Sequence, residues 1–426
     1  MMFGAHQVLR RMGYPGFVNQ IVVELAGRID VTPLRRAIDR LCHRYPVLAA
    51  RIVPDGLIRW AYWSFRPGEV VDLHEADLDA PGRDPVMAYA QQILAIPFDL
   101  SRENPASFHL LHSPDGRDTL ILHFEHAVMD SNALDSLILE LDSLIRCDDH
   151  ADPPPAPEPD DIRNYLKRFP FRTRLSAIFR TRTDPPPWRN GPAVTLVSRT
   201  LLLGPRPYRI AFREVPASTL AAVNARITKA CGYPNLSMGL LASIFRAILE
   251  HVAEPPHRFG RLITHIGFNL RPPDEGDTTS VRNIATVMPI DASIDEAADR
   301  DGLLKTLSRR LRDRLKRQVD LGLLQLVYWH SRRIWFVRFP LKTLFMKRQS
   351  LNYGCFNSII APGATFAGVP IEAAYHVAST SSPPGLSLLA NRFQGRLLFT
   401  AVYVPDAVPP SRMEAFLDTL MSDFTA

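Results

Sequence analysis

Cysteine is scarce in this chain of 426 residues, which holds only Cys42, Cys147, Cys231 and Cys355. The four lie far apart, without a Cys-x-x-Cys pair or a spacing typical of metal ligands. Disulfide-rich secreted domains and zinc modules depend on clustered cysteines. The pattern therefore predicts unpaired thiols in a reducing compartment and no metal site.

Long apolar runs are missing as well. No stretch approaches the roughly 20 apolar residues that a membrane-spanning helix needs, and the N-terminus lacks the apolar centre of a signal peptide. Glycine-rich phosphate loops and the Gly-x-Ser-x-Gly nucleophile motif are also absent. We therefore expect a cytoplasmic protein without a permanently bound cofactor.

Apolar residues, by contrast, make up 46% of the chain, which is long enough for two domains with substantial cores. Prolines and acids gather at 148–161, and a second proline run occupies 184–188. Such segments are typical of semi-rigid connectors. The sequence therefore predicts an N-terminal domain at 1–150, a Pro-rich linker at 151–193 and a C-terminal domain at 194–426.

Local patterns predict an α/β protein. A strand at 17–25 precedes a helix from Thr32 whose apolar stripe is Leu34, Ala37, Ile38, Leu41 and Cys42. The second half is predicted to contain strands at 194–203, 208–215 and 262–269, and helices at 217–230 and 237–251.

The segment 119–131 is the most informative part of the chain. It reads as a buried strand that runs directly into a helix, with His126 and Asp130 at the junction. In the alternating pattern His126 projects with the apolar side chains, while Glu125 projects to the opposite face. Asp130, Ser131 or Asn132 is placed to cap the following helix. Two interpretations remain at this level: a buried structural histidine beside a capping aspartate, or a reactive imidazole exposed at a strand end.

The order of several further segments resembles the condensation-domain-like, coenzyme A-dependent acyltransferase superfamily. It includes peptide-synthetase condensation domains, wax ester synthases, alcohol acetyltransferases and polyketide-associated acyltransferases. Their His-His-x-x-x-Asp-Gly motif aligns on Glu125, His126, Asp130 and Ser131. The other landmarks are Ile96-Pro-Phe-Asp-Leu-Ser101, Asn235-Leu-Ser-Met-Gly, Asn269-Leu-Arg-Pro-Pro273, Arg282-Asn283 and Ala361-Pro-Gly363.

The resemblance implies two chloramphenicol-acetyltransferase-like subdomains in a V-shaped pseudo-dimer with a tunnel between them. It implies an acyl transfer to an alcohol or amine acceptor, from an acyl-CoA or from the phosphopantetheinyl thioester of an acyl-carrier protein. The acyl groups are expected to be other than amino-acyl. His126 is implied as the general base, and Asp130 as a structural partner of Arg271 that supports the loop.

The chain departs from the family motif at two positions. Glu125 replaces the first histidine, and Ser131 replaces the closing glycine, whose backbone freedom serine lacks. Because His126 and Asp130 are retained, the sequence favours an active acyltransferase. The alternative is a catalytically degenerate relative that binds a carrier protein or a lipid as a partner.

Basic residues are concentrated at 305–348, where thirteen Lys or Arg stand against two acids. Three interpretations are open: a solvated helix face that packs on the core, contact with an anionic membrane surface, or docking of a carrier protein or coenzyme A phosphate. The membrane interpretation rests on Trp335, Phe336, Phe339 and Phe345. Nucleic-acid binding is not expected, because no reader motif accompanies the charge.

Overall fold

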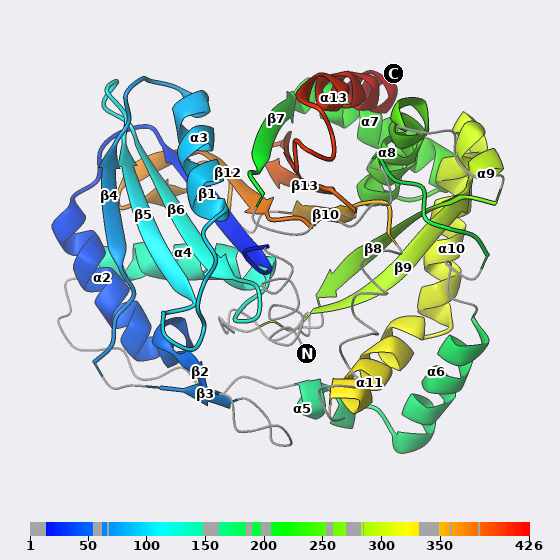
Figure 1. Cartoon of the computed structure of the whole chain (residues 1–426), viewed down its shortest axis with the longest axis horizontal. Helices are drawn as coiled ribbons and strands as arrows, with labels where there is room; N and C mark the ends of the chain where they lie inside the picture. The colour runs from blue at the N-terminus through cyan, green and yellow to red at the C-terminus, as the bar shows by residue number, and fades with distance from the viewer. Residues whose placement is uncertain are drawn as a thin grey trace.

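The computed structural model describes residues 14–53, 62–65, 68–147, 162–184, 190–196, 206–252, 259–269, 283, 285–331, 349–357, 360–381 and 384–426. Figure 1 shows two α/β halves side by side. The first half and the segment after it contain β1 (Val18–Leu25), α2 (Val31–Arg44), η1 (Pro46–Ala49), β2 (Arg51–Val53), β3 (Tyr62–Ser64), β4 (Leu73–Asp77), α3 (Arg83–Leu94), β5 (Ala106–His112), β6 (Asp118–Glu125), α4 (Ser131–Arg146), α5 (Ile162–Lys167) and α6 (Phe171–Thr183).

The second half follows the same α/β pattern. Its elements are β7 (Arg209–Val215), α7 (Ala217–Cys231), α8 (Leu236–His251), β8 (Arg261–Asn269), β9 (Ala285–Ser293), α9 (Ile294–Ala298), α10 (Arg300–Lys316), α11 (Val319–Ser331), β10 (Asn352–Asn357), β11 (Thr365–Phe366), β12 (Val369–Ala378), β13 (Leu386–Phe393), β14 (Arg396–Tyr403) and α13 (Pro410–Thr425).

The first sheet has the strand order β11-β12-β1-β6-β5-β4 and is antiparallel except for the β4–β5 pair. Figure 1 shows α3 in front of this sheet and α4 behind it, so both faces are covered. Accordingly, every residue of β6 is buried. The predicted helix after Thr32 is confirmed as α2, and its five predicted stripe residues are its buried residues.

One strand of the first sheet comes from the second half of the chain. β12 pairs antiparallel with β1, from Asn19 opposite Ala378 to Leu25 opposite Ile371. The division of the chain at residue 194 had assigned this strand to the C-terminal domain. It instead completes the N-terminal sheet, because β1 offers a free edge for backbone hydrogen bonds beside β6.

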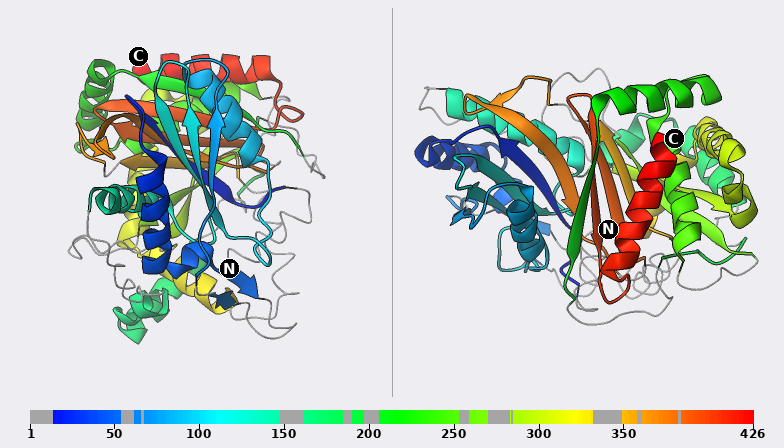
Figure 2. Two further views of the ribbon diagram at one scale, coloured as in Figure 1. Left: turned by 90° about the vertical axis from the view of Figure 1, so that its left-hand side faces the viewer. Right: turned by 90° about the horizontal axis from the view of Figure 1, so that it is seen from above.

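The second half contains a sheet with the order β10-β13-β14-β7 and the separate hairpin β8–β9. Helices α7, α8 and α13 lie beside this sheet (Figure 2). α7 ends at Gly232, which has a φ of 79° and caps the helix in the left-handed conformation. The predicted strand at 194–203 is not found within its described part, 194–196, and 197–203 lies outside the described residues.

The segment predicted as a Pro-rich linker contains two helices, α5 and α6. The inner face of α6 packs against α11, where Ala177 shares a small apolar cluster with Leu321 and Leu324. The proline run at 148–161 lies outside the described residues. The linker prediction therefore missed the helical part because it was drawn from the flanking prolines alone.

The first part of the basic segment 305–348 forms most of α10, and three of the arginines at the end of this helix bind acids within the protein. Arg310 binds Glu296 at 2.7 Å, while Arg314 and Arg317 bind Asp184 at 3.1 and 3.2 Å. Because these charges are paired, α10 fits the interpretation of a helix packed on the core. Residues 332–348, with the four aromatic residues predicted to meet a membrane, lie outside the described residues. None of the helices described here has the length and apolar character to cross a bilayer.

Candidate active site

The turn between β6 and α4 holds His126 in place through its main chain. The strand ends at Glu125, and the amide of His126 donates to the carbonyl of Phe17 at 2.8 Å. The chain then turns, with the amide of Val128 donating to the carbonyl of Glu125 at 3.0 Å. The predicted strand-to-helix junction at His126 is thus confirmed.

The contacts of the His126 ring determine which nitrogen can act as a base. Nδ1 lies 2.7 Å from the carbonyl oxygen of Met129. A carbonyl oxygen only accepts hydrogen bonds, so Nδ1 carries the proton and Nε2 keeps an unprotonated lone pair. Within the described parts of the chain, no hydrogen bond involves Nε2. The half-buried imidazole is therefore held as the tautomer that a general base requires.

Asn283, from the second half of the chain, contacts the same turn. Its Nδ2 donates to the His126 carbonyl at 2.7 Å and lies 3.3 Å from the ring Nδ1. Since Nδ1 already donates to Met129, the short bond to the carbonyl is the one that positions the loop. In the sequence Asn283 was only a landmark of the family resemblance. Its partner lies 157 residues away, a distance that no local pattern reveals.

Asp130 is buried and caps α4. Its side chain accepts a hydrogen bond from the amide of Ala133 at 3.1 Å, and Ser131 is the first residue of the helix. An N-cap aspartate satisfies a helix amide that has no partner within the helix. The expected partner Arg271 lies outside the described residues, so the pairing of Asp130 with Arg271 stays a prediction.

Glu125 lies fully buried on β6, next to His126 in sequence. Its side chain accepts a hydrogen bond from the amide of Phe17 at 3.3 Å, and its own amide donates to the Pro105 carbonyl at 2.9 Å. These contacts fasten the end of β6 to the starts of β1 and β5. Glu125 thus takes part in a hydrogen-bonding network of the sheet.

Two further histidines of the first sheet, His123 and His109, have structural surroundings. Nδ1 of His123 contacts Gln20 at 3.3 Å and its ring packs on Phe98, while His109 contacts the hydroxyls of Tyr89 and Ser107, both at 3.0 Å. Burial lowers the pKa of His123 to about 3 and that of His109 to about 4. Both therefore stay neutral at physiological pH.

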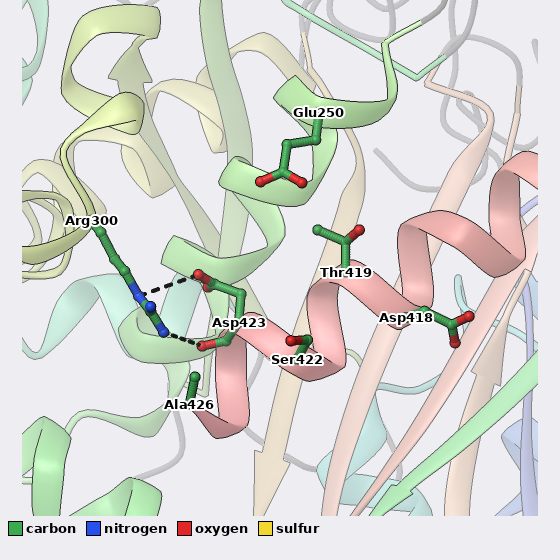
Figure 3. A pocket seen from close by; sticks show the side chains of 7 residues that line it. All are labelled: Glu250, Arg300, Asp418, Thr419, Ser422, Asp423 and Ala426. Atoms are coloured by element: carbon green, nitrogen blue, oxygen red, sulfur yellow. Dashed lines mark hydrogen bonds and ion pairs between the residues drawn. The ribbon is translucent and has the colours of Figure 1, made fainter.

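A polar pocket at the ends of α8 and α13 is separate from this site (Figure 3). Its side chains include Glu250, Arg300 and Asp423, and Arg300 binds Asp423 at 3.5 Å. Arg246 also pairs with Asp423. The pocket contains none of the predicted site residues, and its Asp423 is matched by two arginines.

Comparisons with known proteins give structural matches only. No family model and no curated protein sequence matches the chain. The first condensation domain of the CDA synthetase is similar, with a TM-score of 0.71 and 15% identity over 100% of this chain and 94% of that one. The condensation domain of the monacolin K polyketide synthase has a TM-score of 0.67 and 12% identity, over 99% of this chain and 95% of that one.

A third similar structure is the cyclization-docking bidomain of a nonribosomal peptide synthetase from Sorangium cellulosum. Its TM-score is 0.68 at 15% identity, over 100% of this chain and 83% of that one. These likenesses span the whole chain, so the protein has a condensation-domain-like α/β fold. The fold expected from the sequence resemblance is confirmed.

Proposed function

We propose that the protein is an acyltransferase that moves an acyl group from a thioester donor to an alcohol or amine, with His126 as general base. The single observation that carries the proposal is the contact of His126 Nδ1 with the Met129 carbonyl at 2.7 Å. It leaves the lone pair on Nε2, in a turn that both halves of the chain contact. The condensation-domain-like fold supports the same class of reaction.

In the proposed reaction, Nε2 of His126 takes the proton from the acceptor hydroxyl or amine as the acceptor attacks the thioester carbonyl. The resulting tetrahedral oxyanion collapses, and the carbon–sulfur bond breaks. The leaving thiolate receives the proton from the imidazolium. An ester or amide and a free thiol are formed, and His126 returns to its starting state. An imidazole suits both transfers because its ordinary pKa lies near neutrality.

The similar structures favour a carrier-bound donor. Several belong to nonribosomal peptide synthetases, and one belongs to a polyketide synthase. We therefore place a carrier-bound thioester ahead of acyl-CoA as the donor. The proposed acyl group is other than amino-acyl, as the sequence resemblance implies. The donor and acceptor are proposed to approach His126 from opposite sides, through a tunnel between the halves.

Asp130 is proposed to keep the loop of His126 in place rather than to relay protons. Its carboxylate caps α4 through Ala133, and a carboxylate can accept hydrogen bonds from more than one donor. An arginine would fit this role, because a guanidinium binds a carboxylate in a fixed, bidentate geometry. Arg271, in the Asn-Leu-Arg-Pro segment, is the proposed partner.

A substrate panel tests the function. The protein is incubated with acyl-CoA, acyl-carrier and aminoacyl-carrier thioesters, each with alcohol and amine acceptors, while free thiol and product mass are measured. We expect thiol release that requires both an acyl thioester and an acceptor. Binding of a carrier without turnover of any donor would instead support the alternative of a catalytically degenerate partner protein.

A further inference from the structure

Helix α6 exposes an apolar stripe on the outer edge of the molecule. Phe171, Leu175 and Phe179 follow one another at intervals of four residues, so they lie along one helix face. Their exposed fractions are 63%, 49% and 70%. Figure 1 shows α6 at the periphery, beside α10 and α11. Three large apolar side chains in a row on one helix are unusual for a surface that meets only water.

The orientation of this stripe is fixed by the neighbouring face of α6, which packs against α11. Ala177 and Ile178 are buried, and the Thr181 hydroxyl donates to the carbonyl of Val319 at 3.3 Å. α6 lies so close to α11 that a Cβ atom at Gly322 would overlap Thr181 and the Ala177 carbonyl. α6 therefore cannot turn its stripe inward without breaking this close contact.

The charged residues of α5, α6 and the loop between them are all basic. Residues 162–183 contain seven Lys or Arg and no Asp or Glu. Arg172, Arg180 and Arg182 are exposed, and within the described part of the chain none of them forms an ion pair with its side chain. Three arginines of α10 (Arg300, Arg310 and Arg314), by contrast, form internal ion pairs.

We propose that the α6 face, defined as Phe171, Arg172, Leu175, Phe179, Arg180 and Arg182, docks on an anionic lipid bilayer. A helix with aromatic and aliphatic residues on one side and arginines beside them can lie in the bilayer interface, with its apolar side among the acyl chains. The arginines then meet the lipid phosphates. A bilayer accepts a convex apolar ridge, whereas a folded acidic protein needs a groove that matches it. The proposal does not depend on acyl transfer.

Vesicle flotation tests the proposal. The full chain is mixed with phosphatidylcholine vesicles, or with vesicles of equal parts phosphatidylcholine and phosphatidylglycerol, at low and high salt. We expect binding to the anionic vesicles only, with weaker binding at high salt, because the screening length falls from about 10 Å at 0.1 M to about 3 Å at 1 M. Absence of binding to the anionic vesicles at low salt overturns the proposal.

Two double variants separate the apolar and charged contributions. Phe171→Ser with Phe179→Ser should weaken anionic-vesicle binding about a hundredfold, from the apolar area that stays in water. Arg172→Gln with Arg182→Gln should weaken it about thirtyfold, at roughly fivefold per arginine. Circular dichroism verifies that each variant is folded.

The matched controls are Phe259→Ser, at a phenylalanine that is 60% exposed, and Arg309→Gln, at an exposed arginine of α10. Both should bind as the wild type does. Equal loss in the controls and in the α6 variants overturns the assignment of the face. Retention on polyglutamate without binding to anionic vesicles would assign the α6 face to an acidic protein instead.

Discussion

His126 is held from its Nδ1 side and from its main chain, so its reactivity is concentrated on Nε2. Met129 and Phe17 supply the contacts from the first half, and Asn283 supplies one from the second. A base held in this way loses little freedom when it accepts a proton. The chemistry proposed for the protein therefore depends on a few backbone carbonyls as much as on the imidazole.

Asn283→Ala tests the contact between the halves at this site. Loss of its hydrogen bond to the His126 carbonyl should cost about 1 kcal/mol of stability, and the displaced loop should lower kcat. We expect kcat to fall about tenfold while the KM for the donor changes little, since Asn283 acts through His126. The matched control is Asn104→Ala, whose Nδ2 donates to the Val70 carbonyl at 2.8 Å. A wild-type kcat in Asn283→Ala would show that Asn283 does not position His126.

The buried histidines predict that stability falls in mild acid. Burial lowers the pKa of His109 to about 4 and that of His123 to about 3. An unfolded chain protonates its imidazoles near pH 6.5. Below that pH the unfolded state binds protons that the folded state excludes. The free energy of unfolding is therefore highest above about pH 6.5 and decreases progressively as the pH falls toward 4.

Urea unfolding of the wild type and of His109→Gln at pH 7 and at pH 5 measures this effect. Each of these two buried histidines should lower the free energy of unfolding of the wild type by about 2 kcal/mol between pH 7 and pH 5. His109→Gln removes one of these costs, so its free energy of unfolding should depend less on pH. An identical loss in both proteins would show that His109 does not titrate as its burial requires.

At the scale of elements, local sequence predicted those helices whose faces meet a core. α2 agrees with its prediction because its five buried residues and its cap, Asp30, lie within one short stretch of the sequence. α7 and α8 matched for the same reason, and Gly232 marks the end of α7. α6 was missed, since its inner face is only Ala177 and Ile178 and its outer face carries exposed apolar residues.

The helix α4 gives a test of the second role proposed for Asp130. Asparagine caps helices about as well as aspartate does, so Asp130→Asn should be nearly neutral if capping is its only role. If the carboxylate also pairs with Arg271, the free energy of unfolding of the variant falls by roughly 3 kcal/mol, because the arginine is left without its counter-charge. We predict the larger loss, measured by urea unfolding, and a similar loss for Arg271→Ala.

Asp30→Asn is the matched control for this comparison. Asp30 caps α2 through the amide of Thr32 at 2.8 Å and lies at the surface. Its replacement should change stability by only a few tenths of a kcal/mol, because no ion pair is lost. If Asp130→Asn were as mild as Asp30→Asn, the pairing with Arg271 would have to be abandoned.

At the scale of the whole molecule, the two halves complete one another. β12 adds a strand to the sheet that carries His126, and Ser379 extends this contact by donating from its amide to the Val18 carbonyl at 2.8 Å. Asn283 adds a second bridge at the active-site turn. The candidate site therefore belongs to the assembled molecule rather than to either half.

The addition of β12 to the first sheet could not be predicted from the sequence. The pattern of 369–378 is that of a buried strand, and it fits a sheet in either half. Its partner β1 lies more than 340 residues earlier, and such pairing depends on the assembled fold. The sequence did identify His126 and Asp130, because the strand, the turn and the helix cap are adjacent in the chain.

The most direct test of the central proposal is the single-turnover rate of acyl transfer in His126→Ala, with the donor and acceptor that the substrate panel identifies. His43→Ala, at an exposed histidine of α2, is the matched control. We predict that His126→Ala unfolds in urea as the wild type does but transfers its acyl group about 10²–10⁴-fold more slowly, while His43→Ala keeps the wild-type rate. A folded His126→Ala protein with the wild-type rate would contradict the assignment of His126 as the general base.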